Sequence, residues 1–135
     1  MVSNITNSLS KHDGTKLLEE LQAGFSWEWD SRFKTVLAQV GINEKDAAEK
    51  IMINYLGTAW DSVTIKKAPE SEQRILVRLG GMMSGQLFYT AGLPENGIVF
   101  CAWWPWGNGQ TISIRLGTNL EDSTLLDTLA KPDAS

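Results

Sequence analysis

The sequence predicts an α+β protein, with N-terminal helices packed on one face of a roughly five-stranded antiparallel meander and a short C-terminal helix. Three observations support this class. Apolar residues recur at helical spacing up to Gly57, the apolar period then changes to two, and residues 98–116 have the pattern of a β-hairpin. Helices followed by closely spaced strands are typical of α+β domains, because short connections force antiparallel pairing. A sheet curled around a helix to leave a cavity is the alternative architecture.

The N-terminal part of the chain is expected to contain three helices. Residues 1–9 are expected to form a flexible lead-in, and residues 10–135 a single domain. Cap-forming residues and glycine stops delimit helices over residues 12–23, 26–40 and 43–56. Since each of these helices carries one apolar stripe, we expect them to pack on the same face of the sheet.

The C-terminal part of the chain is expected to contain the sheet. Short apolar segments separated by turn residues predict strands at residues 63–65, 75–79 and 86–90, followed by the two arms of the hairpin. After the hairpin, residues 118–121 have the form of a capping box, which predicts a short leucine-rich helix near the C-terminus.

The hairpin determines which side chains share a face of the sheet. Its first arm, residues 98–106, is apolar throughout, and Asn108-Gly109 is a dipeptide favoured at the centre of a type I′ turn. Folding the arms back at this dipeptide gives one wholly apolar face, which is the expected core face. The core face pairs Trp103 with Ile114, Cys101 with Leu116 and Pro105 with Ile112; the other face pairs Trp104 with Ser113, Trp106 with Thr111 and Ala102 with Arg115.

The second face of the hairpin is the predicted binding site. Indole and phenyl rings lie there beside hydroxyl groups and a guanidinium, a mixture typical of contact surfaces. Residues 75–80 resemble residues 112–117, so a second arginine is expected on the same face, as in a site for an anion or carboxylate. A covering helix or subunit, or a bulge at Pro105 that turns Trp104 inward, is the alternative interpretation. The predicted binding residues are Phe100, Trp104, Trp106, Arg115 and Arg78.

Composition limits the partners of the protein. Twelve basic and sixteen acidic residues give a net charge of −4, whereas binding of nucleic acid requires a basic surface, so no nucleic-acid partner is expected. The longest apolar run is too short for a membrane helix, and the polar N-terminus lacks the apolar stretch of a signal peptide. The single cysteine favours a reducing compartment. We therefore expect a cytoplasmic protein with no membrane partner.

No catalytic or metal-binding set of residues stands out. His12 is the only histidine, which excludes a two-histidine metal site, and Cys101 is expected to point into the core and be unreactive. Glu28 and Asp30 lie beside tryptophans, where desolvation could raise a carboxyl pKa, but residues two apart on a helix point away from each other. Asp61 is expected to be a turn residue. Accordingly, no catalytic residue, no metal and no cofactor are predicted.

The predicted function is that of a non-enzymatic binding or interaction module that uses the aromatic-rich sheet face and could form a homodimer. The expected occupant is a protein partner or a second copy of the chain, and a small-molecule ligand is the second choice. Two alternatives remain: an enzyme with carboxylate acid–base chemistry in an aromatic-lined cavity, and an acidic inhibitor or immunity-type protein. A deep closed pocket containing Asp61 or Glu28 would favour the enzyme.

Overall fold

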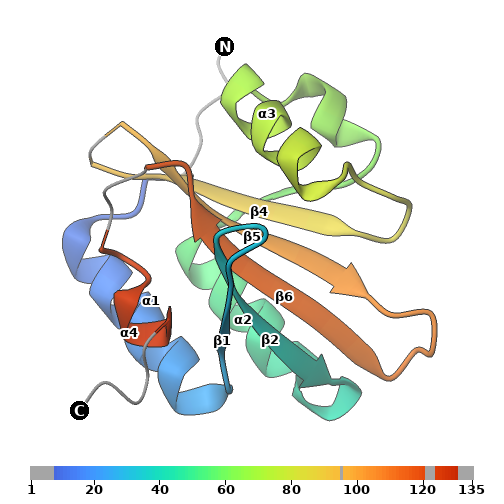
Figure 1. Cartoon of the computed structure of the whole chain (residues 1–135), viewed down its shortest axis with the longest axis horizontal. Helices are drawn as coiled ribbons and strands as arrows, with labels where there is room; N and C mark the ends of the chain where they lie inside the picture. Colours follow the sequence, from blue (N-terminus) through green and yellow to red (C-terminus); the bar gives the residue numbers. More distant parts are fainter. Residues whose placement is uncertain (1–7, 95, 121–123, 131–135) are drawn as a thin grey trace.

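The structure, a computed structural model, describes residues 8–94, 96–120 and 124–130. It has the α+β class that the sequence predicts (Figure 1). In chain order the elements are α1 (Lys11–Gly24), β1 (Glu28–Asp30), β2 (Thr35–Gly41), the 3-10 turn Ile42–Glu44, α2 (Lys45–Tyr55), β3 (Thr58–Trp60), the 3-10 turn Thr64–Lys67, α3 (Glu70–Leu79), β4 (Leu87–Gly92), β5 (Ile98–Pro105), β6 (Thr111–Thr118) and α4 (Asp127–Ala130).

The strands of the described residues form one six-stranded antiparallel sheet in the order β1-β2-β6-β5-β4-β3. The sequence predicted about five strands in a simple meander. Strands β3, β4, β5 and β6 are neighbours in chain order, although α3 lies between β3 and β4. The meander is broken at β2, which comes early in the chain yet pairs with β6. The C-terminal hairpin is therefore at the centre of the sheet.

One face of the sheet, which we call the α1/α2 face, carries the larger core. Helices α1, α2 and α4 lie on this face, and Figure 1 shows α2 passing behind the sheet. We expected these helices to cover Ile112, Ile114, Ile75 and Val77. Ile112 and Ile114 are buried in this cluster, whereas Ile75 and Val77 belong to α3 and are not part of the sheet. Ser10 caps α1 as expected, because its Oγ accepts a hydrogen bond from the backbone N–H of Asp13 at 3.1 Å.

The opposite face, which we call the α3 face, carries a second and smaller core. Helix α3 packs Ile75, Leu76 and Leu79 against Phe88 and Phe100 of the sheet. Figure 1 shows α3 at one end of the sheet, beside β4. The expectation that the N-terminal helices share one face is confirmed for α1 and α2. Helix α3, which was not predicted from the sequence, lies on the opposite face.

Residues 26–40 were predicted to form a helix, and this is wrong: they form β1, a tight turn and β2. The apolar residues of this segment fit helical spacing, but Val36, Ala38 and Val40 also alternate with period two, and all three face the core. Pairing of β2 with β6 over six residue pairs decides in favour of the strand. The turn before β2 places Lys34 at a φ of 55°.

Residues 75–79 were predicted to form a strand, and this is also wrong: they belong to α3. Pro69 precedes the first turn of α3, which carries two glutamates, and Gly80 ends the helix in the left-handed region at a φ of 101°. Buried Ile75, Leu76 and Leu79 follow helical spacing, whereas Val77 is 78% exposed. The resemblance of residues 75–80 to residues 112–117 thus reflects no shared geometry.

The other predicted helices and strands differ less from those of the structure. The helices expected at residues 12–23 and 43–56 correspond to α1 and α2, and the strand expected at residues 86–90 corresponds to β4. The strand expected at residues 63–65 is wrong, because a 3-10 turn lies there and the strand β3 lies before it. Residues 1–7 of the expected lead-in lie outside the described residues. Leu9 is buried, and its N–H donates to Gly92 O at 2.8 Å.

The register of the β5–β6 hairpin is confirmed at every predicted pair from Cys101 opposite Leu116 to Pro105 opposite Ile112. The N–H of Trp106 donates to Thr111 O at 2.8 Å and continues this alignment. The turn is not type I′, because Gly109 has a positive φ and Asn108 does not. Instead, the Asn108 side chain accepts hydrogen bonds from the N–H groups of Gln110 and Thr111, which closes a longer loop.

In the described residues the C-terminal helix α4 begins at Asp127, after the predicted capping box. Thr118 belongs to β6; its hydroxyl donates to Ile98 O at 2.8 Å and accepts a hydrogen bond from the Leu120 N–H at 3.2 Å. Glu121, the other half of the predicted box, lies outside the described residues. The end of the leucine-rich stretch forms α4, and its Leu129 is fully buried in the larger core.

Candidate binding site

The α3 face brings together three of the five predicted binding residues. Trp104, Trp106 and Arg115 lie there on neighbouring strands, at the positions that the hairpin register predicts. Trp104 and Arg115 are half-buried and Trp106 is 42% exposed. Phe100 lies on the same face but is fully buried beneath α3, with its ring centroid 5.5 Å from that of Phe88. Arg78 is exposed on α3 and does not share the strand face.

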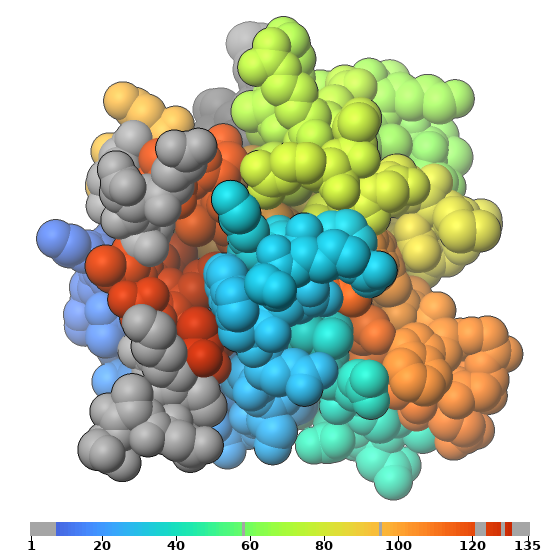
Figure 2. Space-filling model, viewed as in Figure 1, coloured from blue at the N-terminus to red at the C-terminus, as the bar shows by residue number. Residues whose placement is uncertain are grey.

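The turn between β1 and β2 supplies the rest of the site. Figure 2 shows this segment, in cyan, over the centre of the visible face, with α3 above it and the hairpin end to the right. Phe33 from this turn packs against the smaller core together with Trp104. The partly covered region between α3, the turn and the hairpin end is where the candidate site lies.

Arg115 contacts two aromatic rings and a carboxylate. Its guanidinium carbon lies 4.8 Å from the ring centroid of Phe33 and 5.5 Å from that of Trp104. Its Nη1 donates to Asp30 Oδ2 at 2.5 Å, with the two side chains 11% and 19% exposed. Two ring contacts and a charged hydrogen bond restrain the guanidinium, as in sites built for planar recognition.

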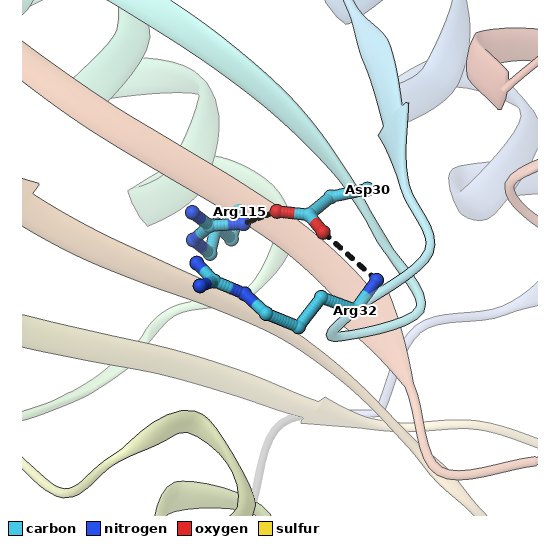
Figure 3. A network of polar contacts seen from close by, with 3 residues as sticks. All are labelled: Asp30, Arg32 and Arg115. Carbon is cyan, nitrogen blue, oxygen red and sulfur yellow. Dashed lines mark hydrogen bonds and ion pairs between the residues drawn. The ribbon is translucent and has the colours of Figure 1, made fainter.

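Asp30 connects the turn to the sheet. Its second oxygen, Oδ1, accepts a hydrogen bond from the backbone N–H of Arg32 at 3.0 Å (Figure 3). The hydrogen bond from Arg115 and those from the turn hold the pKa of Asp30 below its ordinary value. The carboxylate therefore stays ionised and keeps Arg115 in place.

Arg32 is a site residue that sequence reasoning missed. Its guanidinium carbon lies 4.4 Å from the ring centroid of Phe33, and Figure 3 shows its side chain extending toward Arg115. Among the described residues, no carboxylate forms an ion pair with the Arg32 guanidinium. The prediction placed a second arginine on this face and chose Arg78; the structure places Arg32 there. If residues 35–40 had been predicted as a strand, the residues before them, including Arg32, would have been predicted as a turn.

Trp106 is the most exposed aromatic ring of the site. Its Nε1 donates to Ser113 Oγ at 2.7 Å, so the indole is fixed although 42% of the residue is exposed. Beside it, Trp104 Nε1 and Arg115 Nε are buried, and no acceptor among the described residues bonds to either atom. The site therefore presents a rigid aromatic surface next to two unpaired hydrogen-bond donors.

The structure places the candidate carboxylates in strand β1 and in a turn, and Cys101 in the core. The pKa of Asp61 is lowered by hydrogen bonds from the turn that follows it, as the pKa of Asp30 is lowered by Arg115. Glu28 and Asp30 share a face of β1, which corrects the expectation that a helix separates them, but Asp30 is committed to Arg115. Burial raises the pKa of the Cys101 thiol.

The part of the chain that the structure describes offers neither a metal site nor a membrane span. No group of three or more of its histidine, cysteine, aspartate or glutamate side chains lies close enough to hold a metal ion. No helix in the described ranges has the length and apolarity needed to cross a membrane.

Comparison with protein-family models, with curated proteins and with solved structures finds no match to this chain.

Proposed function

We propose that the protein is a non-enzymatic binding module, and that the α3 face around Trp104, Trp106 and Arg115 is its contact surface. The observation that carries this proposal is the fixed, exposed indole of Trp106 beside two buried donors without acceptors. Buried polar groups almost always have partners, and rigid exposed indoles are frequent anchors of protein contacts. A partner placed on this face would cover the indole and supply the acceptors.

The partner that can be tested directly is a second copy of the chain. Trp106 is 42% exposed; covering that part of an indole removes roughly 100 Å² from water and contributes about 2 kcal/mol. Losing this contribution raises the Kd about thirtyfold. Trp106→Ala should therefore weaken self-association strongly while leaving the far-UV circular dichroism unchanged, since the indole lies outside both cores.

Sedimentation velocity of the full chain from micromolar to millimolar concentration measures this association. Trp29→Ala is the matched control, because Trp29 is 48% exposed but pairs with Val36 and points to the α1/α2 face. We expect reversible association that Trp106→Ala weakens and Trp29→Ala leaves unchanged. A mass of one chain at all concentrations, or an equal effect of both variants, contradicts the proposed contact between copies.

A further inference from the structure

The cluster around Arg115 carries an excess of positive charge. Two guanidinium groups, those of Arg32 and Arg115, lie within 5 Å of the Phe33 ring centroid, and Asp30 is the carboxylate paired there. Lys34, in the same β1–β2 turn as Arg32, is exposed. In a chain with a net charge of −4, this local excess attracts anions to one place on the surface.

The unpaired donors of the cluster require an acceptor. Arg115 uses Nη1 for Asp30, but its Nε and the neighbouring Trp104 Nε1 are buried without an acceptor among the described residues. Each buried donor left unpaired costs about 1 to 3 kcal/mol. Both atoms can only donate, so a cation cannot satisfy them, and an apolar ligand would leave them unpaired.

We infer that this cluster is a binding site for an oxyanion, a carboxylate or phosphate group carried by a ligand or partner. Arg32 and Arg115 supply the charge, Trp104 Nε1 and Arg115 Nε supply directed donors, and Phe33 and Trp104 form the walls. Asp30 holds Arg115 in position without neutralising Arg32. The inference rests on the proposed binding function and names the chemistry of what this face binds. Arginine is suited to this role, because its planar fork matches oxyanion geometry.

The test is a titration of the full chain with inorganic phosphate and, separately, with acetate, followed by ¹H–¹⁵N NMR spectroscopy. Sodium chloride at equal ionic strength is the reference, since it screens charge without offering two acceptor oxygens. We expect the Trp104 indole N–H and the Arg115 Nε–H signals to shift and to saturate with at least one oxyanion. Saturation with phosphate alone assigns a phosphorylated ligand, and saturation with acetate alone assigns a carboxylate ligand.

Arg32→Gln is the variant of choice, because Arg32 is exposed and its side chain takes no part in the ion pair with Asp30. Losing one charge-assisted contact should weaken oxyanion binding about tenfold. Arg78→Gln is the matched control, since Arg78 is also an exposed arginine but lies on α3. It should leave the affinity unchanged. Arg115→Gln is unsuitable, because it would deprive Asp30 of its partner and confound binding with folding.

Shifts that do not saturate, shifts equal to those with chloride, or equal weakening by Arg32→Gln and Arg78→Gln overturn the oxyanion site. This failure is distinct from failure of the proposed function. Self-association that depends on Trp106 without a saturating oxyanion response rejects the site alone. Oxyanion binding in a chain that stays monomeric rejects contact between copies and keeps the site.

Discussion

Substituting Gly117 tests how closely β6 packs against the Phe100 ring of the smaller core. Gly117 lies opposite Phe100 in the β5–β6 pair, and the Phe100 ring lies across the place where a side chain would begin. A Cβ atom at residue 117 would lie 2.5 Å from Phe100 Cζ and 2.9 Å from Thr35 Cγ2. Both neighbours are fully buried, so neither can move without disturbing the smaller core.

The loss of stability expected for Gly117→Ala follows from these distances. Overpacking of a well-filled core typically costs 1 to 3 kcal/mol, and a rigid ring gives way less readily than an aliphatic end. We therefore expect Gly117→Ala to lower the free energy of unfolding by about 2 kcal/mol. Phe100→Leu removes the Cζ atom that would clash. In that background the cost of Gly117→Ala should fall by about 1 kcal/mol or more, the remainder coming from Thr35.

Urea unfolding followed by far-UV circular dichroism measures all four members of this double-mutant cycle. Gly24→Ala is the control, because Gly24 ends α1 and a methyl group added there would meet no atom within 4 Å. That control should be neutral or stabilising by up to about 1 kcal/mol, as alanine is the better helix former. Wild-type stability for Gly117→Ala, or the same cost with and without the Phe100 ring, would refute the packing argument.

Three further predictions concern residues outside that pair. Lys34→Gly should raise the free energy of unfolding by roughly 0.5 to 1 kcal/mol, because Lys34 has a φ of 55°; lower stability in urea would contradict this. Cys101, whose burial raises the thiol pKa, should react with a disulfide reagent only on unfolding, so rapid labelling of native protein would count against it. The hydrogen bond from Arg115 lowers the pKa of Asp30 in the folded protein. The stabilisation of the fold by ionised Asp30 is therefore present above its unfolded pKa of about 3.9 and is lost as the pH falls through the folded pKa. The difference in unfolding free energy between wild type and Asp30→Asn, measured from neutral pH to pH of about 2, should shrink accordingly.

The hairpin could be predicted from the sequence because its signals are local and agree with each other. Strict alternation at residues 111–116 sets the face of each side chain, and the adjacent loop sets the register. This register alone predicted the face of the sheet on which Trp104 and Arg115 lie. The turn type did not, because the Asn108 side chain bonds to the backbone in the structure.

The segments that were assigned wrongly are those in which two periods fit the same residues. Residues 35–40 satisfy helical spacing as well as alternation, and only pairing with β6 decides between them. For α3, by contrast, Pro69 and Gly80 are local boundary signals that favour the helix. The Asp30–Arg115 ion pair joins residues 85 positions apart, so no local pattern could reveal it.

The position of β2 in the sheet sets the order in which the protein can assemble. Within the described sheet, β2 pairs only with three-residue β1 and with β6, which begins 70 residues after β2 ends at Gly41. The β4, β5 and β6 strands, by contrast, are joined by short loops and can associate locally. A chain emerging from the ribosome consequently cannot pair β2 with β6 until residue 116 has been synthesised, and cannot complete the larger core before Leu129. Such distant pairing raises the contact order and slows the rate-limiting step of folding.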